Sequence, residues 1–262
     1  MQAAIHQIVT FASEPFRGNP AFVLSLDRPV PDDVVRQVAD QLHEGVLSCL
    51  RRLDDGRASL TFHTPTGPHP GAGHAAAAAA HVLLAETGAT EGRVVLHDGR
   101  ERIVTRDGTR ISVPWPLMPW KDVTTADTLS AALRVPVAEA QVADFGYVAI
   151  VDDPAAIASM DPDLDAIAQL DRGSLIVTAP GDSSDIVIRV FAPKQGLPED
   201  PVCGTAHRII VPYWSKRLGK SELHSLQLSP RRGDLWCRLA DDTVVISGET
   251  HRFLKGSIDL RK

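Results

Sequence analysis

The stretch GHAAAAAAHVLLA, residues 73–85, has almost no polar side. Six consecutive alanines follow His74, and four further apolar residues follow His81. Alanine and leucine favour the α-helix. A helix that is apolar all round is enclosed by other structure and does not lie on a surface. The stretch therefore predicts a helix in the centre of a domain.

Strand-forming segments lie on both sides of this helix in the sequence. Ile5–Phe11 and Ala21–Leu26 are apolar runs separated by a turn, and Ser59–Thr64 stops at a proline. Residues 102–113 alternate around an Asp-Gly pair, which predicts a hairpin. Residues 32–42 carry apolar side chains at three- and four-residue spacing, which predicts a helix that ends near residues 43–45. The first half is thus expected to mix strands with one buried and one surface helix.

The second half repeats this order. A strand at 186–191 leads through a proline and a loop to Gly204 and a helix, just as the strand at 59–64 leads through a proline and a loop to Gly73. We interpret this as an internal duplication with a boundary in the Pro- and Trp-rich segment 114–120. The predicted domains are 1–118, which the strand 254–262 would join, and 119–253. Two facing helix N-termini across a cleft between domains would bind a small carboxylate.

Composition limits the kinds of partner. The 262 residues carry a net charge of −6 with a pI near 5.9 and contain no block of basic residues, which disfavours nucleic acid and anionic membranes as partners. No apolar run approaches the roughly 18 residues needed to cross a bilayer, and the N-terminus does not resemble a signal peptide, so we expect a cytosolic protein. The three cysteines have no metal-binding spacing and are expected to be reduced thiols.

The run EDPVCGTAH, Glu199–His207, is the strongest candidate for a ligand site. Pro201 disfavours helix before it, whereas Gly204 lets a ligand approach the backbone and Thr205 adds a hydroxyl beside the free N–H groups of a helix start. This combination predicts an anion site with an acid nearby. An ordinary helix cap on a surface turn explains the same residues equally well.

Taken together, the motifs resemble those of the PhzF family, which is named for phenazine biosynthesis. The matching segments are FRGNP at 16–20, LHE at 42–44, TP at 64–65 followed by AGH at 72–74, and RVFAP at 189–193 followed by Glu199–His207. The resemblance runs from about residue 5 to the C-terminus. It implies an α+β fold like that of diaminopimelate epimerase, with two pseudo-symmetric domains, each a curved, barrel-like sheet around a central helix. It also implies an active site between the domains and a homodimer.

The resemblance also implies roles for particular residues. Glu44 matches the family's acid/base glutamate, which in the phenazine enzyme moves a proton within trans-2,3-dihydro-3-hydroxyanthranilate without any cofactor or metal. A carboxyl group enclosed between domains would have its pKa raised by desolvation, which suits it to taking a proton from one carbon and returning it to another. Substrate-binding residues implied by the match are Gly73, His74, Asp200, Gly204 and Thr205, with Asn19 as a turn residue that supports the site.

The sequence departs from the family pattern around Glu44. The usual Ser-Glu-Thr is replaced by His43-Glu44-Gly45, and a common glutamate after the Thr-Pro turn corresponds to Pro68. The pocket is therefore expected to differ from that of the phenazine enzyme. The substrate is either of the phenazine type or another small biosynthetic intermediate, such as one that undergoes a double-bond isomerisation in antibiotic biosynthesis. A small-ligand-binding protein without turnover is the alternative.

Cys203 suggests a third possibility, because the epimerase relatives use two opposed cysteines as acid and base. The matching position in the first half is Ala72, and a two-base epimerase needs a group on each face of the substrate, so a small buried residue is the preferred interpretation of Cys203. Metal binding is not expected either, because His63, His69, His74 and His81 share no recognised ligand spacing. No dinucleotide or phosphate-loop motif follows Gly71-Ala72-Gly73.

Overall fold

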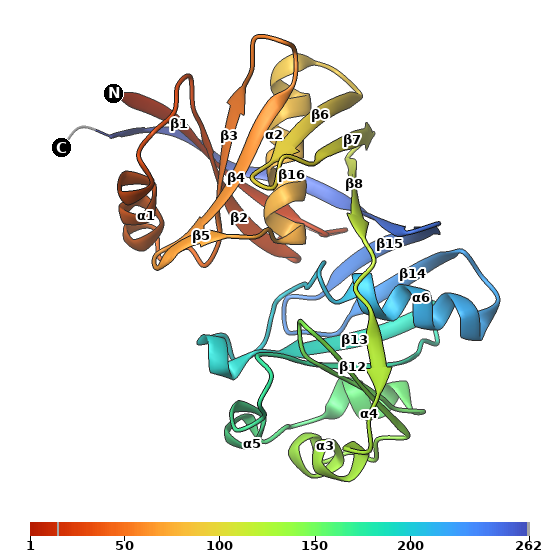
Figure 1. The fold of residues 1–262 in the computed structure, drawn as a ribbon. Coiled ribbons are helices and arrows are strands. Elements are labelled where there is room, and N and C mark those ends of the chain that lie inside the picture. Colours follow the sequence, from red (N-terminus) through yellow and green to blue (C-terminus); the bar gives the residue numbers. More distant parts are fainter. Residues whose placement is uncertain (15, 261–262) are drawn as a thin grey trace. The chain divides into compact units, whose positions relative to one another are not determined.

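The computed structural model describes residues 1–14 and 16–260. The chain divides into two compact units, one formed by Met1–Pro114 with Ser247–Lys262 and the other by Trp115–Ile246. Both units are drawn in Figure 1. Each is described by itself below.

The first unit is a closed barrel of eight strands. Neighbouring strands follow the order β1-β2-β3-β4-β6-β7-β8-β16, and β16 also pairs with β1. The strands are β1 (Gln2–Thr10), β2 (Asn19–Ser25), β3 (Leu47–Arg52), β4 (Ala58–Thr64), β6 (Glu91–Leu96), β7 (Glu101–Asp107), β8 (Arg110–Pro116) and β16 (Thr243–Asp259), with the short β5 (Gly67–His69) paired to β4. The predicted hairpin is confirmed, because Asp107 pairs with Arg110 between β7 and β8.

Helix α2 (Gly73–Thr87) occupies the centre of this barrel, as the apolar stretch predicts (Figure 1). Residues 75–80 and 82–84 are all buried. Alanine side chains are short, so the surrounding strands can approach the helix backbone, and the Ser48 hydroxyl donates a hydrogen bond to the Ala75 carbonyl over 2.9 Å. The helix ends at Gly88, whose φ of 70° provides the left-handed C-terminal residue.

Helix α1 (Asp32–Gln41) lies outside the barrel. It buries Val35 and Ala39 against an apolar cluster that includes Leu24, Leu47 and Cys49 from β2 and β3. The barrel wall is therefore covered on its inner side by α2 and, in this region, on its outer side by α1.

The second unit is a sheet with helices on both faces. Its strand order continues from β16 as β15-β14-β13-β12-β11-β10-β9. The strands are β9 (Trp120–Asp122), β10 (Glu139–Ala143), β11 (Tyr147–Ile150), β12 (Leu175–Pro180), β13 (Ile186–Phe191), β14 (Glu222–Gln227) and β15 (Gly233–Ala240); the helices are α3 (Ala126–Leu133), α4 (Pro154–Ser159), α5 (Leu164–Ala168), η1 (Pro193–Gln195) and α6 (His207–Leu218). Helices α3, α4 and α5 bury Leu129, Ile157 and Ile167 in one core cluster with strands β12 and β13.

Helix α6 packs against the opposite face of this sheet. The Trp214 indole N–H donates to the Thr178 hydroxyl of β12 over 3.0 Å. Pro212 lies inside the helix and has no N–H to donate to the Arg208 carbonyl, which instead accepts a hydrogen bond from the Met118 amide over 3.1 Å. The helix begins at His207 and not at Gly204, because residues 204–206 form a turn.

Gly18 is the glycine that the first unit depends on most clearly. Its φ is +72°, and a Cβ at this position would lie 2.3 Å from the Thr10 carbonyl oxygen. Gly56 has a similar φ of +83° but nothing within 4 Å of the corresponding position. We expect Gly56→Ala to lower the free energy of unfolding by about 1 kcal/mol and Gly18→Ala to cost a further 1–3 kcal/mol, roughly, from overlap. Chemical denaturation of both variants measures the difference, and equal losses would contradict the overlap.

Candidate functional site

The end of helix α1 places Glu44. His43 has a left-handed φ of 51°, its N–H donates to the Asp40 carbonyl over 3.0 Å, and the Glu44 N–H donates to the Ala39 carbonyl over 2.9 Å. These two hydrogen bonds form a Schellman motif, which usually has glycine at the left-handed position. The motif ends the helix and turns the chain back toward β3, with Glu44 at the turn.

The Glu44 carboxylate lies at the open end of a parallel strand pair. The β2–β3 ladder begins with Val23 opposite Ser48. The carboxylate accepts hydrogen bonds from the N–H groups of Phe22 and Val46, which lie one and two residues before this ladder. Burial raises the pKa of Glu44 from 4.5 to about 7, while the two N–H groups act in the opposite direction. At neutral pH the side chain can therefore either accept or donate a proton.

This raised pKa has a consequence for stability. Between pH 4.5 and about 7 the folded protein holds a proton on Glu44 that the unfolded chain has released, so stability falls as the pH rises through this window. Relative to Glu44→Gln, the wild type should lose on the order of 2–3 kcal/mol of unfolding free energy between pH 4 and pH 8. Parallel stability curves for the two proteins, measured by urea denaturation across this range, would show that the Glu44 pKa is not raised.

The two residues next to Glu44 in the sequence are exposed, and a larger side chain would fit at Gly45. Both His43 and Gly45 are exposed. A Cβ added at Gly45 would meet nothing within 4 Å. The absence of a threonine here is thus not imposed by crowding. The neighbouring residues His43 and Gly45 carry no hydroxyl group, unlike the serine and threonine of the family pattern.

His74 lies in the first turn of α2, directly after Gly73. Burial lowers the pKa of His74 to about 4, and the nearby His69 lowers it further. The imidazole is therefore neutral at physiological pH and can donate one hydrogen bond while accepting another. The N–H groups of the first turn have no intrahelical acceptor, so they add positive partial charge at this helix end.

Asn19 has a structural place in the first unit. It is 6% exposed, begins β2 and pairs with Thr10 of β1. The Thr10 hydroxyl donates to the Asn19 carbonyl over 3.0 Å. Together with the tight turn at Gly18, this hydrogen bond fixes where β2 starts.

The residues predicted from the second half lie in the second unit. The Asp200 N–H donates to the Val190 carbonyl over 2.9 Å, and the Asp200 carboxylate accepts from the Val202 N–H over 3.1 Å and from the Cys203 thiol. Burial raises the pKa of Asp200 to about 6. Gly204 is buried and Thr205 half-buried, and their carbonyls accept hydrogen bonds from the first N–H groups of α6.

Two interactions that the sequence does not reveal hold this loop. Gln227 of β14 donates from its side-chain amide to the Asp200 carbonyl over 2.6 Å and accepts from the Cys203 N–H over 2.8 Å. Arg189 of β13 forms a two-pronged ion pair with Glu199 over 2.7 and 2.8 Å, with the side chains 12% and 15% exposed. Gln227 lies 24 residues beyond Cys203, so no local motif could have indicated this contact.

Cys203 is a buried thiol and not a base. Burial raises the pKa of the Cys203 thiol well above its ordinary value, and the Asp200 carboxylate adds to the effect. His207 of the same motif donates from Nδ1 to the Cys203 carbonyl over 2.9 Å and contacts the Ser225 hydroxyl over 2.8 Å. Burial lowers the pKa of His207 to about 4, so it is a neutral residue within the core. Both observations favour the structural interpretation of Cys203.

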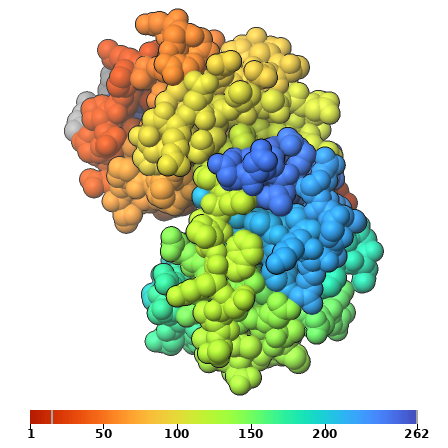
Figure 2. Space-filling view, turned by 45° about the vertical axis from the view of Figure 1, so that its right-hand side comes forward, coloured from red at the N-terminus to blue at the C-terminus, as the bar shows by residue number. Residues whose placement is uncertain are grey.

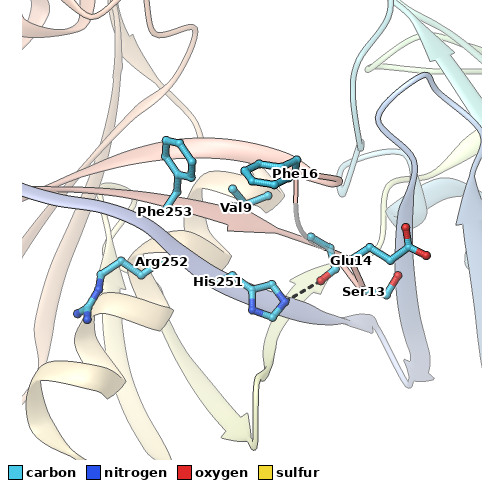
Figure 3. Close-up of a pocket in the computed structure, with 8 residues that line it drawn as sticks. Val9, Ser13, Glu14, Phe16, His251, Arg252 and Phe253 are labelled. Atoms are coloured by element: carbon cyan, nitrogen blue, oxygen red, sulfur yellow. Dashed lines mark hydrogen bonds between the residues drawn. The ribbon is translucent and has the colours of Figure 1, made fainter.

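The first unit also has a hollow of about 270 Å³ that contains none of the candidate residues. Figure 3 shows it lined by Phe16 and Phe253, whose rings lie on either side of Val9, and by His251, which donates from Nε2 to the Ala12 carbonyl over 2.9 Å. Within residues 1–14 and 16–260, no three His, Cys, Asp or Glu side chains are grouped so as to hold a metal ion. None of the helices described is long and apolar enough to cross a membrane.

Comparison with known proteins agrees with this architecture. The family model for phenazine biosynthesis-like proteins matches residues 8–256. A Pseudomonas aeruginosa protein named as an uncharacterized isomerase is 34% identical over 99% of this chain and 100% of the relative. The crystal structure of a PhzF-family protein from Enterococcus faecalis has a TM-score of 0.92 at 31% identity over 99% of this chain and 100% of that chain. A protein of the same kind from Clostridium difficile has a TM-score of 0.88 at 28% identity over 98% and 99% of the two chains.

The fold is therefore the α+β, diaminopimelate epimerase-like fold, which more distant epimerase structures also share. The chain belongs to the phenazine biosynthesis-like (PhzF) family. This confirms the resemblance inferred from the sequence motifs.

Proposed function

We propose that the protein is a cofactor-independent isomerase of a small biosynthetic intermediate and that Glu44 moves the proton. The observation that carries the proposal is the raised pKa of Glu44, about 7, in a residue whose position the Schellman motif fixes. A carboxyl group with this pKa is a competent base and, once protonated, a competent acid near neutral pH.

In the proposed reaction Glu44 takes a proton from a carbon next to a double bond. The C–H electron pair moves into the unsaturated system and the double bond shifts. The protonated Glu44 exchanges its proton with solvent and then delivers a solvent-derived proton to another carbon of the same molecule. Atoms and charge balance without a second reactant. Because one group performs both transfers, both take place on the same face of the substrate.

The other candidate residues are proposed to bind the substrate. The neutral His74 would donate to a hydroxyl or amine, and the N–H groups that begin at Gly73 would favour a carboxylate. Asp200 would accept a hydrogen bond from an amino group, with Gly204 and Thr205 contributing to the same part of the substrate. Asn19 is proposed to support the site from beneath. A substrate that carries both an amino and a carboxyl group fits this set of donors and acceptors.

The substrate is either trans-2,3-dihydro-3-hydroxyanthranilate or a related unsaturated intermediate of secondary metabolism. The exposed His43 and Gly45 give Glu44 different neighbours from those of the family pattern, which favours a related molecule over the phenazine precursor itself. The wild-type protein should be incubated in deuterated water with dihydrohydroxyanthranilate and with pyrroline-type dienes. Mass spectrometry should then show one solvent deuteron per turnover or back-exchange event.

A ligand-binding protein without turnover is the second candidate, and the altered residues beside Glu44 are the observation that favours it. Calorimetric titration of the same compounds distinguishes the two. Tight binding of a compound that takes up no deuterium would support the binding protein and contradict the isomerase. Binding accompanied by deuterium uptake supports the isomerase.

A further inference from the structure

The short strand β5 ends in a histidine that lies close to the start of α2. His69 is the last residue of β5, and the chain runs from there through residues 70–72 into the helix (Figure 1). The orange part of the chain, to which this segment belongs, forms part of the molecular surface in Figure 2. The His69 side chain is half-buried. It is therefore available to a ligand at the helix start that carries Gly73 and His74.

Strand register directs the His69 side chain toward α2. Ser48 of β3 lies opposite Phe62 of β4, and Phe62 lies opposite His69 of β5. Residues directly opposite each other place their side chains on the same face of a sheet. Ser48 shows which face this is, because its hydroxyl donates to the Ala75 carbonyl in the first turn of α2. His69 therefore lies on the face of the sheet that meets the start of α2.

His69 and His74 are neighbouring neutral imidazoles at this end of the barrel. Burial lowers the pKa of His74 to about 4, and His69 is near enough to lower it further. Burial also lowers the pKa of His69, and the exposed His97 acts in the same direction. At physiological pH each of the two rings therefore has one N–H group and one nitrogen lone pair.

A backbone hydrogen bond fixes which nitrogen of His69 carries the proton. The Gly71 N–H donates to Nδ1 of His69 over 3.1 Å. Nδ1 therefore supplies the lone pair, and the proton of the neutral ring is on Nε2. Among residues 1–14 and 16–260 no group forms a hydrogen bond with Nε2, and this atom is not buried away from solvent. His69 thus presents one N–H donor that the described chain leaves without an acceptor.

We propose, on the basis of the isomerase function proposed above, that His69 is a further substrate-binding residue whose Nε2–H donates to the carboxylate of the substrate. The donor requires an acceptor, and an ammonium group has no lone pair to offer. The N–H groups in the first turn of α2 favour negative charge at the same place. Residues 64–74 include no acidic side chain that would repel a carboxylate.

The residues around His69 make this contact a property of this chain. The family pattern usually has a glutamate where this chain has Pro68, directly before His69. The negative charge of that glutamate is absent here, and an N–H donor follows in the next residue. His69 and His74 then have separate tasks, because His69 holds the carboxylate while His74 remains free to contact a hydroxyl or amine.

Ligand binding to matched variants tests the assignment. Anthranilate and its neutral amide, 2-aminobenzamide, differ in the group that His69 would contact. His69→Phe keeps a ring without the N–H and should weaken anthranilate binding about 10- to 100-fold, but 2-aminobenzamide binding only about 2- to 10-fold, because hydrogen bonds to charged groups are the stronger ones. His69→Gln retains an N–H donor and should recover most of the affinity. The control His97→Gln removes the neighbouring exposed imidazole and should bind both compounds as the wild type does. Isothermal titration calorimetry measures all the dissociation constants.

Nitrogen NMR provides a readout that a loss of folding does not imitate. In wild-type protein labelled with ¹⁵N-histidine, the His69 ring is assigned by comparison with the two His69 variants. It should show a protonated Nε2 whose signal moves when anthranilate is added. A proton on Nδ1 would overturn the proposal. So would equal anthranilate dissociation constants for the wild type and His69→Phe, or no saturable binding of anthranilate to the wild type.

The same variants distinguish failure of this assignment from failure of the isomerase. With a substrate that takes up deuterium, His69→Phe should raise KM about 10- to 100-fold and change kcat little, because the carboxylate is held equally in the substrate and in the transition state. Deuterium uptake that depends on Glu44 but has the same KM in His69→Phe would contradict the role of His69 alone. Binding that depends on His69 without any deuterium uptake would contradict the isomerase and support the contact.

Discussion

Replacing Glu44 with glutamine is expected to lower kcat for solvent-deuterium incorporation by about 10²- to 10⁴-fold, the usual contribution of a positioned acid/base group. Glutamine keeps an oxygen that can accept from the Phe22 and Val46 N–H groups but cannot take up a proton at neutral pH. In the proposed mechanism Glu44 first acts as a base, so kcat/KM of the wild type should rise with pH, with a midpoint near 7, and then become level. Rapid-quench mass spectrometry across pH 5 to 9 measures both quantities.

Two further variants separate chemistry from folding. Asp40→Asn removes an exposed acid from the same helix end and should leave the rate unchanged. Glu44→Asp keeps a carboxyl group but shortens the side chain by one methylene. We therefore expect it to retain part of the wild-type rate and the same midpoint of the pH profile. If Glu44→Gln converted a substrate at the same rate as the wild type, Glu44 would not be the acid/base residue.

Replacing Glu199 with glutamine is expected to lower the free energy of unfolding by about 3 kcal/mol or more, because it leaves the Arg189 guanidinium without its partner in a largely buried site. Arg189 also donates to the carbonyls of Ile157 and Met160, so the charge cannot turn away to water without breaking further hydrogen bonds. Since Glu199 precedes Asp200, the loop that carries Asp200 should loosen as well. KM should then rise more than kcat falls.

The matched control is an exposed ion pair in the same unit. Arg134 and Asp161 approach to 3.3 Å with side chains 56% and 94% exposed, and Asp161→Asn should change stability by less than about 0.5 kcal/mol. Guanidinium denaturation compares the two substitutions. If Glu199→Gln proved as mild as Asp161→Asn, the buried ion pair would not be what holds the loop.

The sequence alone predicted the parts of the fold that rest on local patterns. Residues 73–85 predicted the buried helix α2 because an all-apolar helix has no side that tolerates water. The Asp107-Gly108 pair predicted the β7–β8 hairpin because a tight turn needs these residue types. The family motifs predicted the fold because they are spread in order over nearly the whole chain. The start of α6 was less predictable, because residues 204–206 form a turn before the helix begins.

Only the tertiary structure decided the electrostatics of the candidate residues. Glu44 has a raised pKa because folding buries its carboxyl group beside the amides of Phe22 and Val46, and His74 is neutral because folding buries its ring. Gln227 and Arg189 hold the Asp200 loop from strands that only the sheet brings alongside it. The sequence thus determined which side chains the protein has and which segments become helices and strands. Proton affinity depends on the solvent and dipoles around a group, and those exist only once distant segments have packed together.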